Sequence, residues 1–341
     1  MDKLGLKDPQ TWDEFVALLT AFVRNNPDHN KNVTGITTNS PGTFRTSVFN
    51  SWNPYPEWWA KYKGKWVAPI EYPAALTTVQ MAHQLYTHGL LDKDWGNPNN
   101  NPTTKFISSQ AGAIEWQPKH IDQLALAWDQ AHKGTKFTDI AKILLMPPGP
   151  DGKRYVFEYR DWWSESTFSA AVSDAKMARI LALYNYLLSP EGRKLVLFGF
   201  AGKDYKMVND TVVSLHPASW NIGAAYPSTG VFNSLAAWGL APDWQSEFKT
   251  TNPIPAGWTP ALWSMLQQYV RLVLKTNSPY RIDWAVTAYA SSLPHALDPS
   301  ATAFVQAVAS SNPAQVWAQY VQEENKLGLA KATALVNEKF K

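Results

Sequence analysis

The strongest constraint on the fold of this chain is the alternation of helical patterns with short apolar runs. In the segment 105–116, a short amphipathic turn precedes the apolar run Ala111–Ile114, which turn-forming residues bound. Such brief apolar runs are typical of strands covered on both faces, as in parallel sheets. Similar runs at 35–38, 140–146 and 167–172 are expected to be strands. The alternation predicts an α/β fold with a mostly parallel sheet.

Helix boundaries are marked by local signals. Thr11 and Glu14 form a capping box, and Phe15, Leu18, Leu19 and Phe22 follow at helical spacing, so a helix should run to about residue 24. Ser189-Pro190 should begin another helix. Two hairpins are expected, turning at Lys63-Gly64 and at Asn209-Asp210. Further helices are predicted at 75–86, 121–128, 174–188 and 260–275, with three more from 301 to the end.

Glu115 and Trp116 follow directly after the predicted strand Ala111–Ile114. In open α/β sheets, ligands bind at the carboxyl ends of the strands. We therefore expect Trp116 to lie where a ligand binds. The alternative is a tryptophan at the rim that packs on its own lobe.

Aromatic residues are unusually abundant, with 17 Trp and 14 Tyr, and many lie in loops rich in proline. Aromatic side chains in loops are amphipathic surfaces on which sugars and planar groups stack. The loop 50–66 contains Trp52, Tyr55 and Trp58, which are predicted either to line a sugar site or to form a minor core beneath the loop. A polar and aromatic stretch that is expected to cross between lobes adds four candidate ligand contacts: Glu158, Asp161, Trp162 and Trp163.

Composition excludes several classes of function. The net charge of +3 is spread thinly, without a block of like charge, so nucleic acid is not an expected partner. The chain has no cysteine, and no apolar run approaches the ~20 residues of a transmembrane helix. Its first residues carry no apolar segment of a signal peptide. The loop 26–34 resembles a calcium loop but lacks the glycine and the final glutamate, so neither a metal nor a cofactor is predicted.

Several motifs in order resemble the extracellular solute-binding proteins of carbohydrate ABC transporters, especially the larger lipoprotein-type members. They are Leu4-Gly5-Leu6 with Thr11–Phe15, Phe106 with Gln110–Gly112, Leu187–Gly192, Gly199 with Gly202, Asp204 and Tyr205, and Trp317 with Tyr320, Val321, Leu327–Leu329 and Asn337.

The resemblance implies a periplasmic-binding-protein-like (type II) architecture of two α/β lobes, with a carbohydrate ligand in the interlobe cleft. It further implies ABC transporter permease subunits as partners, a monomer, and an extracytoplasmic location with a lipid anchor on a preceding segment. In the family, the segment that resembles Thr11–Phe15 lies well inside the chain, so the sequence is expected to be N-terminally truncated. Residues 1–165 with 255–341 would then form the C-terminal-type lobe, and 166–254 part of the second lobe.

Two other functions remain open. A carbohydrate-active enzyme would need two carboxyl groups spaced across a sugar, for which Glu115, Glu158, Asp161 and Glu165 are candidates. The sequence does not identify such a pair, and no enzymatic activity is predicted. The other alternative is a non-binding remnant, in which the aromatic residues serve only as core.

Overall fold

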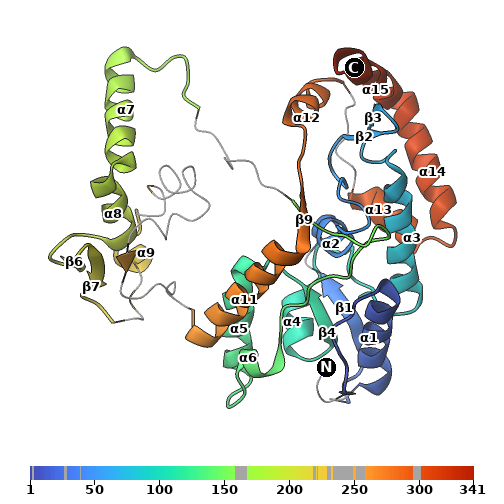
Figure 1. The fold of residues 1–341 in the computed structure, drawn as a ribbon, viewed down its shortest axis with the longest axis horizontal. Coiled ribbons are helices and arrows are strands. Elements are labelled where there is room, and N and C mark those ends of the chain that lie inside the picture. The colour runs from blue at the N-terminus through green and yellow to red at the C-terminus, as the bar shows by residue number, and fades with distance from the viewer. Residues whose placement is uncertain are drawn as a thin grey trace. The chain divides into compact units, whose positions relative to one another are not determined.

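The computed structural model describes residues 1, 4–26, 29–38, 40–157, 167–217, 220, 222–228, 232, 249–250, 258–294 and 301–341. The chain divides into two compact units. Unit 1 comprises Met1–Glu158 and Ser264–Lys341, and unit 2 comprises Tyr159–Trp263. Each is described by itself below, and Figure 1 shows the elements of both. Among the described residues, no helix is long and apolar enough to span a membrane.

The centre of unit 1 is the parallel strand pair β1 (Thr34–Thr38) and β4 (Ala111–Glu115), in which Thr38 is opposite Glu115. Helix α1 (Trp12–Asn25) packs against this pair. The contact is close because two strand positions are glycine. A Cβ on Gly35 would lie 2.8 Å from Leu19 Cβ, and one on Gly112 would lie 2.4 Å from the ring of Phe22.

The predicted start of α1 is confirmed, with a difference in the capping box. The Thr11 hydroxyl accepts from the backbone N–H of Glu14 at 3.2 Å, as expected. The Glu14 carboxylate accepts from the backbone N–H of Gln10 at 2.6 Å rather than from that of Thr11. Both contacts pair N–H groups at the start of the helix, so the sequence signal and the physical effect agree.

The core of unit 1 joins segments that are distant in the sequence. Phe15, Phe44 and Phe49 are almost completely buried with Phe304, and Trp95 packs edge-on to both Phe44 and Phe304. The C-terminal helices α13 (Ala301–Ala309) and α14 (Pro313–Glu324) pack against α3 (Pro73–Thr87). These helices lie together in Figure 1.

The remaining elements of unit 1 are α2 (Pro41–Val48), β2 (Ala60–Tyr62), β3 (Lys65–Val67), α4 (Pro102–Ile107), a 3₁₀ turn (Pro118–His120), α5 (Ile121–Ala131), α6 (Phe137–Ile140), β5 (Arg154–Phe157), β9 (Asn277–Tyr280), α12 (Trp284–Ser291), a π-helical turn (Asn325–Leu329) and α15 (Ala330–Lys339).

The prediction of a strand at 140–146 is wrong. Ile140 ends α6, and residues 141–149 form neither helix nor strand, although Leu144 and Met146 pack on the core. An apolar run is buried equally well as a strand or as irregular structure. A strand also needs a neighbouring strand to pair its backbone N–H and C=O groups. The next strand, β5, does have one, because it pairs in parallel with β9.

Unit 2 is built around the helix pair α7 (Asp174–Leu188) and α8 (Pro190–Phe198). Ser189 caps α8 as predicted, accepting from the N–H of Gly192 at 3.1 Å. The hairpin β6 (Tyr205–Val208) and β7 (Thr211–Ser214) turns where predicted, and β8 (Lys249–Thr250) pairs in parallel with β7. Helices α9 (Ile222–Ala225) and α11 (Pro260–Thr276) complete the described elements, and α11 crosses the division between the units.

The prediction of a strand at 167–172 is also wrong, because these residues form irregular structure and a turn and are almost all exposed. Phe168, the largest apolar side chain of this run, is 41% exposed, so the segment contributes little to a core. Helix α7 leaves several apolar side chains exposed, namely Leu181, Leu183, Tyr186 and Leu188.

Candidate functional site

The candidate site lies at the carboxyl end of the β1–β4 pair. Because the two strands are parallel and Thr38 is opposite Glu115, their last residues meet at the same edge of the sheet. Helix α2 begins just after β1, with Ser40 as its N-cap, and also contacts β4. The strand extends one residue further than expected, so Glu115 is its last residue and Trp116 follows it directly. This edge is the usual place for a ligand in α/β folds.

Glu115 is buried and sits within a cluster of hydroxyl groups. The Thr38 and Thr43 hydroxyls lie 3.0 and 3.1 Å from Oε2, and the Ser47 hydroxyl lies 3.1 Å from Oε1. The exposed fraction of Glu115 is 8%. Each hydroxyl has one proton and also lies within hydrogen-bond distance of a backbone carbonyl, that of Ser40 for Thr38 and Thr43 and that of Thr43 for Ser47. An ionised carboxylate offers about four acceptor positions, so positions remain for a donor from a ligand. The sequence indicates Glu115 but not these three hydroxyls.

Trp116 is half-buried, and its indole N–H donates to the carbonyl of His120 at 2.9 Å. This bond fixes the ring against the short 3₁₀ turn that follows β4. The polar atom of the indole is therefore used within unit 1. Stacking of a sugar needs only a ring face, so the bond orients the ring without occupying that face.

A buried ion pair lies at the same strand ends and was missed by the sequence analysis. Asp92 follows Leu91, which bridges to Ile36 of β1. Lys105 Nζ lies 2.8 and 2.9 Å from the two oxygens of Asp92 and 2.8 Å from Asp94. The Thr37 hydroxyl donates to Asp92 at 2.7 Å. The available signal was an acid directly after an apolar pair, the same pattern as at Ile114-Glu115.

The charge states of this pair follow from its contacts. Burial alone raises the pKa of Asp92, but the hydrogen bonds from Lys105 and Thr37 outweigh it and hold the pKa below its usual value. Burial lowers the pKa of Lys105, and its bonds to Asp92 and Asp94 raise it above the usual value. Both groups are therefore charged at neutral pH, and Asp92 does not hold a proton for acid catalysis.

The predicted aromatic contacts of the loop 50–66 pack within unit 1. The Trp52 ring lies edge-on to Trp12 at 5.4 Å, and Trp58 lies edge-on to Trp284 at 5.3 Å. Tyr55 is half-buried and lies edge-on to Tyr72 and Tyr280. Trp52 also packs on the main core, which matches the alternative of a core beneath the loop. The other four candidates, Glu158, Asp161, Trp162 and Trp163, lie outside the described residues, as does Glu165.

The loop that resembles a calcium site is closed by its own side chains. The Asn26 side-chain amide donates to the carbonyl of Asn30 at 2.7 Å, and its oxygen accepts from the N–H of Asn30 at 3.0 Å. Asp28 lies outside the described residues. In the part of the chain that the structure describes, no three His, Asp or Glu side chains gather as metal ligands.

Unit 2 holds a second polar cluster, centred on Asp204. This carboxylate is 2% exposed and accepts from the Phe200 N–H at 2.8 Å and the Tyr226 hydroxyl at 2.7 Å, and it lies 2.8 Å from Nε2 of His216. Burial raises the pKa of Asp204, but these bonds outweigh it and lower the pKa to about 2. Since every contact is within the 199–226 segment, the cluster organises this part of unit 2.

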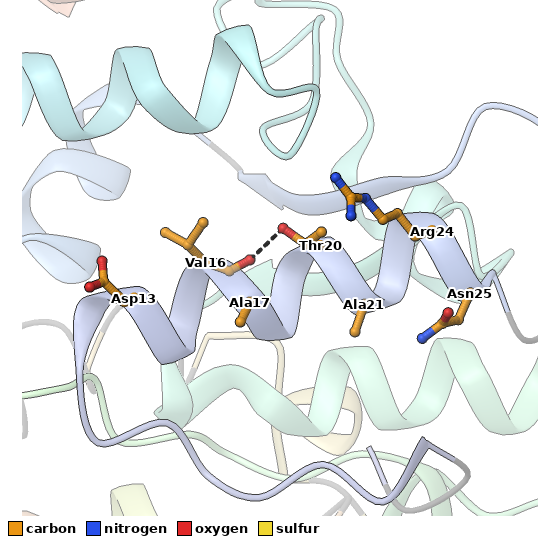
Figure 2. Close-up of a pocket in the computed structure, with 7 residues that line it drawn as sticks. All are labelled: Asp13, Val16, Ala17, Thr20, Ala21, Arg24 and Asn25. Atoms are coloured by element: carbon orange, nitrogen blue, oxygen red, sulfur yellow. Dashed lines mark hydrogen bonds between the residues drawn. The ribbon is translucent and has the colours of Figure 1, made fainter.

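A shallow hollow of about 430 Å³ lies on the exposed face of α1. Figure 2 shows Val16, Thr20 and Arg24 on one side of the helix and Ala17 and Ala21 on the other. The Thr20 hydroxyl donates to the Val16 carbonyl at 2.8 Å, so it is satisfied within the helix. The lining includes none of the residues at the β1–β4 edge, so this hollow is not part of the candidate site.

Comparisons with known proteins identify relatives of the predicted kind, although no protein-family model matches the chain. The lipoprotein LipO of Bacillus subtilis is 26% identical over 234 residues, which cover 63% of this chain and 44% of LipO. The polygalacturonan/rhamnogalacturonan-binding protein YtcQ of the same organism is 24% identical over 217 residues, covering 62% of this chain and 42% of YtcQ. Each match thus spans less than half of the relative's length.

Solved structures of solute-binding proteins show the same fold. The S. pneumoniae ABC-transporter substrate-binding protein FusA, in complex with kestose, has a TM-score of 0.63 at 15% identity. The alginate-binding protein AlgQ2 without calcium ion has a TM-score of 0.60 at 16% identity. Each comparison covers 99% of this chain and 69% of the other. The predicted fold class and the resemblance to this group of proteins are confirmed.

Proposed function

We propose that this chain binds carbohydrate as the substrate-binding component of an ABC transporter. Its fold is that of such proteins, and YtcQ, FusA and AlgQ2 are named or described with polysaccharide or oligosaccharide ligands. The observation that carries the proposal is the parallel β1–β4 pair, which ends at Thr38 and Glu115 with Trp116 just beyond. A strand end is a rigid support for groups that must hold a ligand in one orientation.

In this proposal, a sugar ring stacks on Trp116 and one of its hydroxyls donates to Glu115. The three protein hydroxyls around Glu115 hold the carboxylate in place, and its remaining acceptor positions are available to the ligand. Tyr55 and Trp58 are half-buried and are proposed as further ring contacts. The candidates Glu158, Asp161, Trp162 and Trp163 remain predictions.

Calorimetric titration with a panel of neutral and acidic oligosaccharides tests this function. Trp116→Ala should weaken binding more than about tenfold, because a stacked indole buries apolar surface worth about 1.5–3 kcal/mol. Leu126→Ala, which removes an apolar side chain that is 61% exposed on α5, is the control and should leave affinity unchanged. If a sugar binds and Trp116→Ala changes neither affinity nor stability, the site is elsewhere.

The two alternatives give different results in simple assays. A carbohydrate-active enzyme would turn over the oligosaccharide during a long incubation, and we expect the ligand to be recovered intact. A non-binding remnant would show no shift in thermal unfolding with any sugar of the panel, whereas a bound ligand raises the unfolding temperature. We expect such a shift with at least one sugar.

We further propose that the protein works outside the cytoplasm as a monomer, held at the membrane by a lipid anchor and delivering its ligand to permease subunits. The support is the name of LipO as a lipoprotein and the description of FusA as an ABC-transporter protein. Co-purification of the complete protein with permease subunits from membranes, in the presence of ligand, would test the partnership. Recovery of the protein only in the cytoplasmic fraction would contradict the location.

A further inference from the structure

The β2–β3 hairpin carries three lysines around one tyrosine. Lys61, Lys63 and Lys65 are all exposed, and Tyr62 between them is 37% exposed. The turn at Lys63-Gly64 has φ angles of 49° and 81°, the left-handed pair that a tight two-residue hairpin requires. Lys63 lies in the turn and Lys65 is opposite Tyr62 in the ladder, whereas Lys61 is opposite Trp66 and lies on the other face of the hairpin. We call these five residues, 61–65, the lysine–tyrosine hairpin.

This hairpin is held firmly by the last helix. The Trp66 N–H donates to the side-chain oxygen of Asn337 at 2.8 Å, and the Asn337 amide donates back to the Trp66 carbonyl at 2.7 Å. The Trp66 indole N–H donates to the carbonyl of Phe340 at 2.9 Å. The hairpin is therefore preorganised, which reduces the entropy that a ligand would have to overcome.

The positive charge of the hairpin is not neutralised within the described residues. Lys61 lies 5.7 Å from the Trp66 ring and Lys63 lies 5.3 Å from the Tyr62 ring, and none of the three lysines pairs there with a carboxylate. The nearby acid Glu71 instead accepts from Asn325 at 3.1 Å. The ammonium groups are thus available to an anionic ligand.

A row of tyrosine rings continues from the hairpin. Tyr62 lies edge-on to Tyr72 at 6.0 Å, Tyr72 to Tyr55 at 5.7 Å, Tyr55 to Tyr280 at 5.5 Å, and Tyr280 to Tyr155 at 6.3 Å. None of the five is buried to the degree of the core rings, and all keep part of their surface accessible within the described residues. A partly exposed tyrosine offers an apolar face to a sugar, and its hydroxyl as well where that group is free. The Tyr155 hydroxyl donates to the carboxylate of Asp151, so this end of the row offers only a ring contact. We call these residues the tyrosine row.

We propose that the lysine–tyrosine hairpin and the tyrosine row bind a carboxylate-bearing polysaccharide, such as a polymer of uronic acids. The lysines contact the carboxylates, and the tyrosines contact the sugar rings along the chain. A uronic acid polymer repeats both features, a ring and a charge, at every unit. This surface includes neither Glu115 nor Trp116, although it shares Tyr55 with the proposed sugar site. The proposal therefore stands whether or not the β1–β4 edge binds a sugar.

The test compares two forms of one ligand on the full chain. Oligogalacturonate and its methyl ester have the same rings, but only the first is charged. Calorimetric titration at low salt should show tighter binding of the charged form. Changing Lys61, Lys63 and Lys65 together to Gln should weaken its binding at least about tenfold, since each exposed ion pair contributes up to about fivefold. The control variant changes three exposed lysines elsewhere in unit 1, Lys7, Lys31 and Lys133, to Gln and should alter affinity by less than about twofold.

Two further variants distinguish the contribution of the Tyr62 ring from that of the β1–β4 edge. Tyr62→Ala should weaken binding of both ligand forms, because it removes a ring contact rather than a charge. Trp116→Ala should cost less oligogalacturonate affinity than the triple lysine variant, because Trp116 lies at the β1–β4 edge and not on the hairpin. Equal affinity for the two ligand forms, no binding of oligogalacturonate, or full affinity in the triple lysine variant would each overturn the proposal. Loss of oligogalacturonate binding in Trp116→Ala alone would instead place the acidic ligand at the β1–β4 edge.

Discussion

Replacing Lys105 by Met should destabilise unit 1 strongly at neutral pH. The ammonium group makes contacts of 2.8 and 2.9 Å to Asp92 and 2.8 Å to Asp94. The side chain of Asp92 is 6% exposed, so the variant leaves a buried carboxylate without its counter-charge. Breaking a fully buried ion pair costs about 3–5 kcal/mol. Because the Lys105 side chain is 24% exposed and Asp94 is 61% exposed, we expect about 2–3 kcal/mol.

The loss should also depend on pH, with a sign that follows from the pKa of Asp92. In the unchanged protein this pKa is lowered, so the stability that the charged carboxylate contributes is present above its unfolded pKa and is lost as pH falls through the folded pKa. In Lys105→Met the burial that raises the pKa is no longer opposed by the ammonium group. In the variant, lowering the pH therefore protonates Asp92 sooner than in the unchanged protein and removes the unpaired charge. The difference in stability between the two proteins should therefore shrink.

Urea unfolding combined with hydrogen exchange of peptides from β1 and β4 would measure the difference in stability between the two proteins, because those peptides report on unit 1 alone. Lys133→Met changes an exposed lysine in the same unit and serves as the control, with an expected effect within about 0.5 kcal/mol. Equal destabilisation by Lys105→Met at about pH 7 and about pH 4.5, or a loss no larger than the control, would refute the account of this ion pair.

Two further predictions concern unit 2. Gly199→Ala should destabilise the unit by about 1–3 kcal/mol or more, because Gly199 has φ 84° and ψ −147° and an added Cβ would lie 2.4 Å from the carboxylate of Asp204. The rate at which a protease cleaves unit 2 measures this loss, and an unchanged cleavage rate would contradict the prediction. The pKa of Asp204 is lowered to about 2, so its contribution to stability should persist at neutral pH and be lost as pH falls from about 4 to about 2. Asp204→Asn should remove that acid transition from the circular dichroism of the protein.

Local structure followed from local signals. The cap at Thr11, the cap at Ser189 and the turn at Lys63-Gly64 were predicted correctly because each depends on residues within a few positions of one another. Glu115 and Trp116 were placed after a strand by the apolar run that precedes them. These features need no knowledge of what packs against them.

The errors and omissions all concern partners that are distant in the sequence. The runs 140–146 and 167–172 are not strands, because nothing in an apolar run specifies whether a second strand is available to complete its hydrogen bonds. In the same way, the contact of Lys105 with Asp92 joins residues on different elements, and the hydroxyls of Thr38, Thr43 and Ser47 reach Glu115 only because α2 packs beside β4.

The sequence by itself determined the α/β class, most helix boundaries, both hairpins and the position of Trp116 at a strand end. Only the tertiary structure decided which polar groups surround Glu115, that Trp52 packs on the core, and that tyrosines from 55 to 280 form one row. The physical reason is the distance along the sequence over which each interaction acts. Caps, turns and periodicity act over a few residues, whereas the partners of a buried charge or ring are chosen by the packing of whole elements.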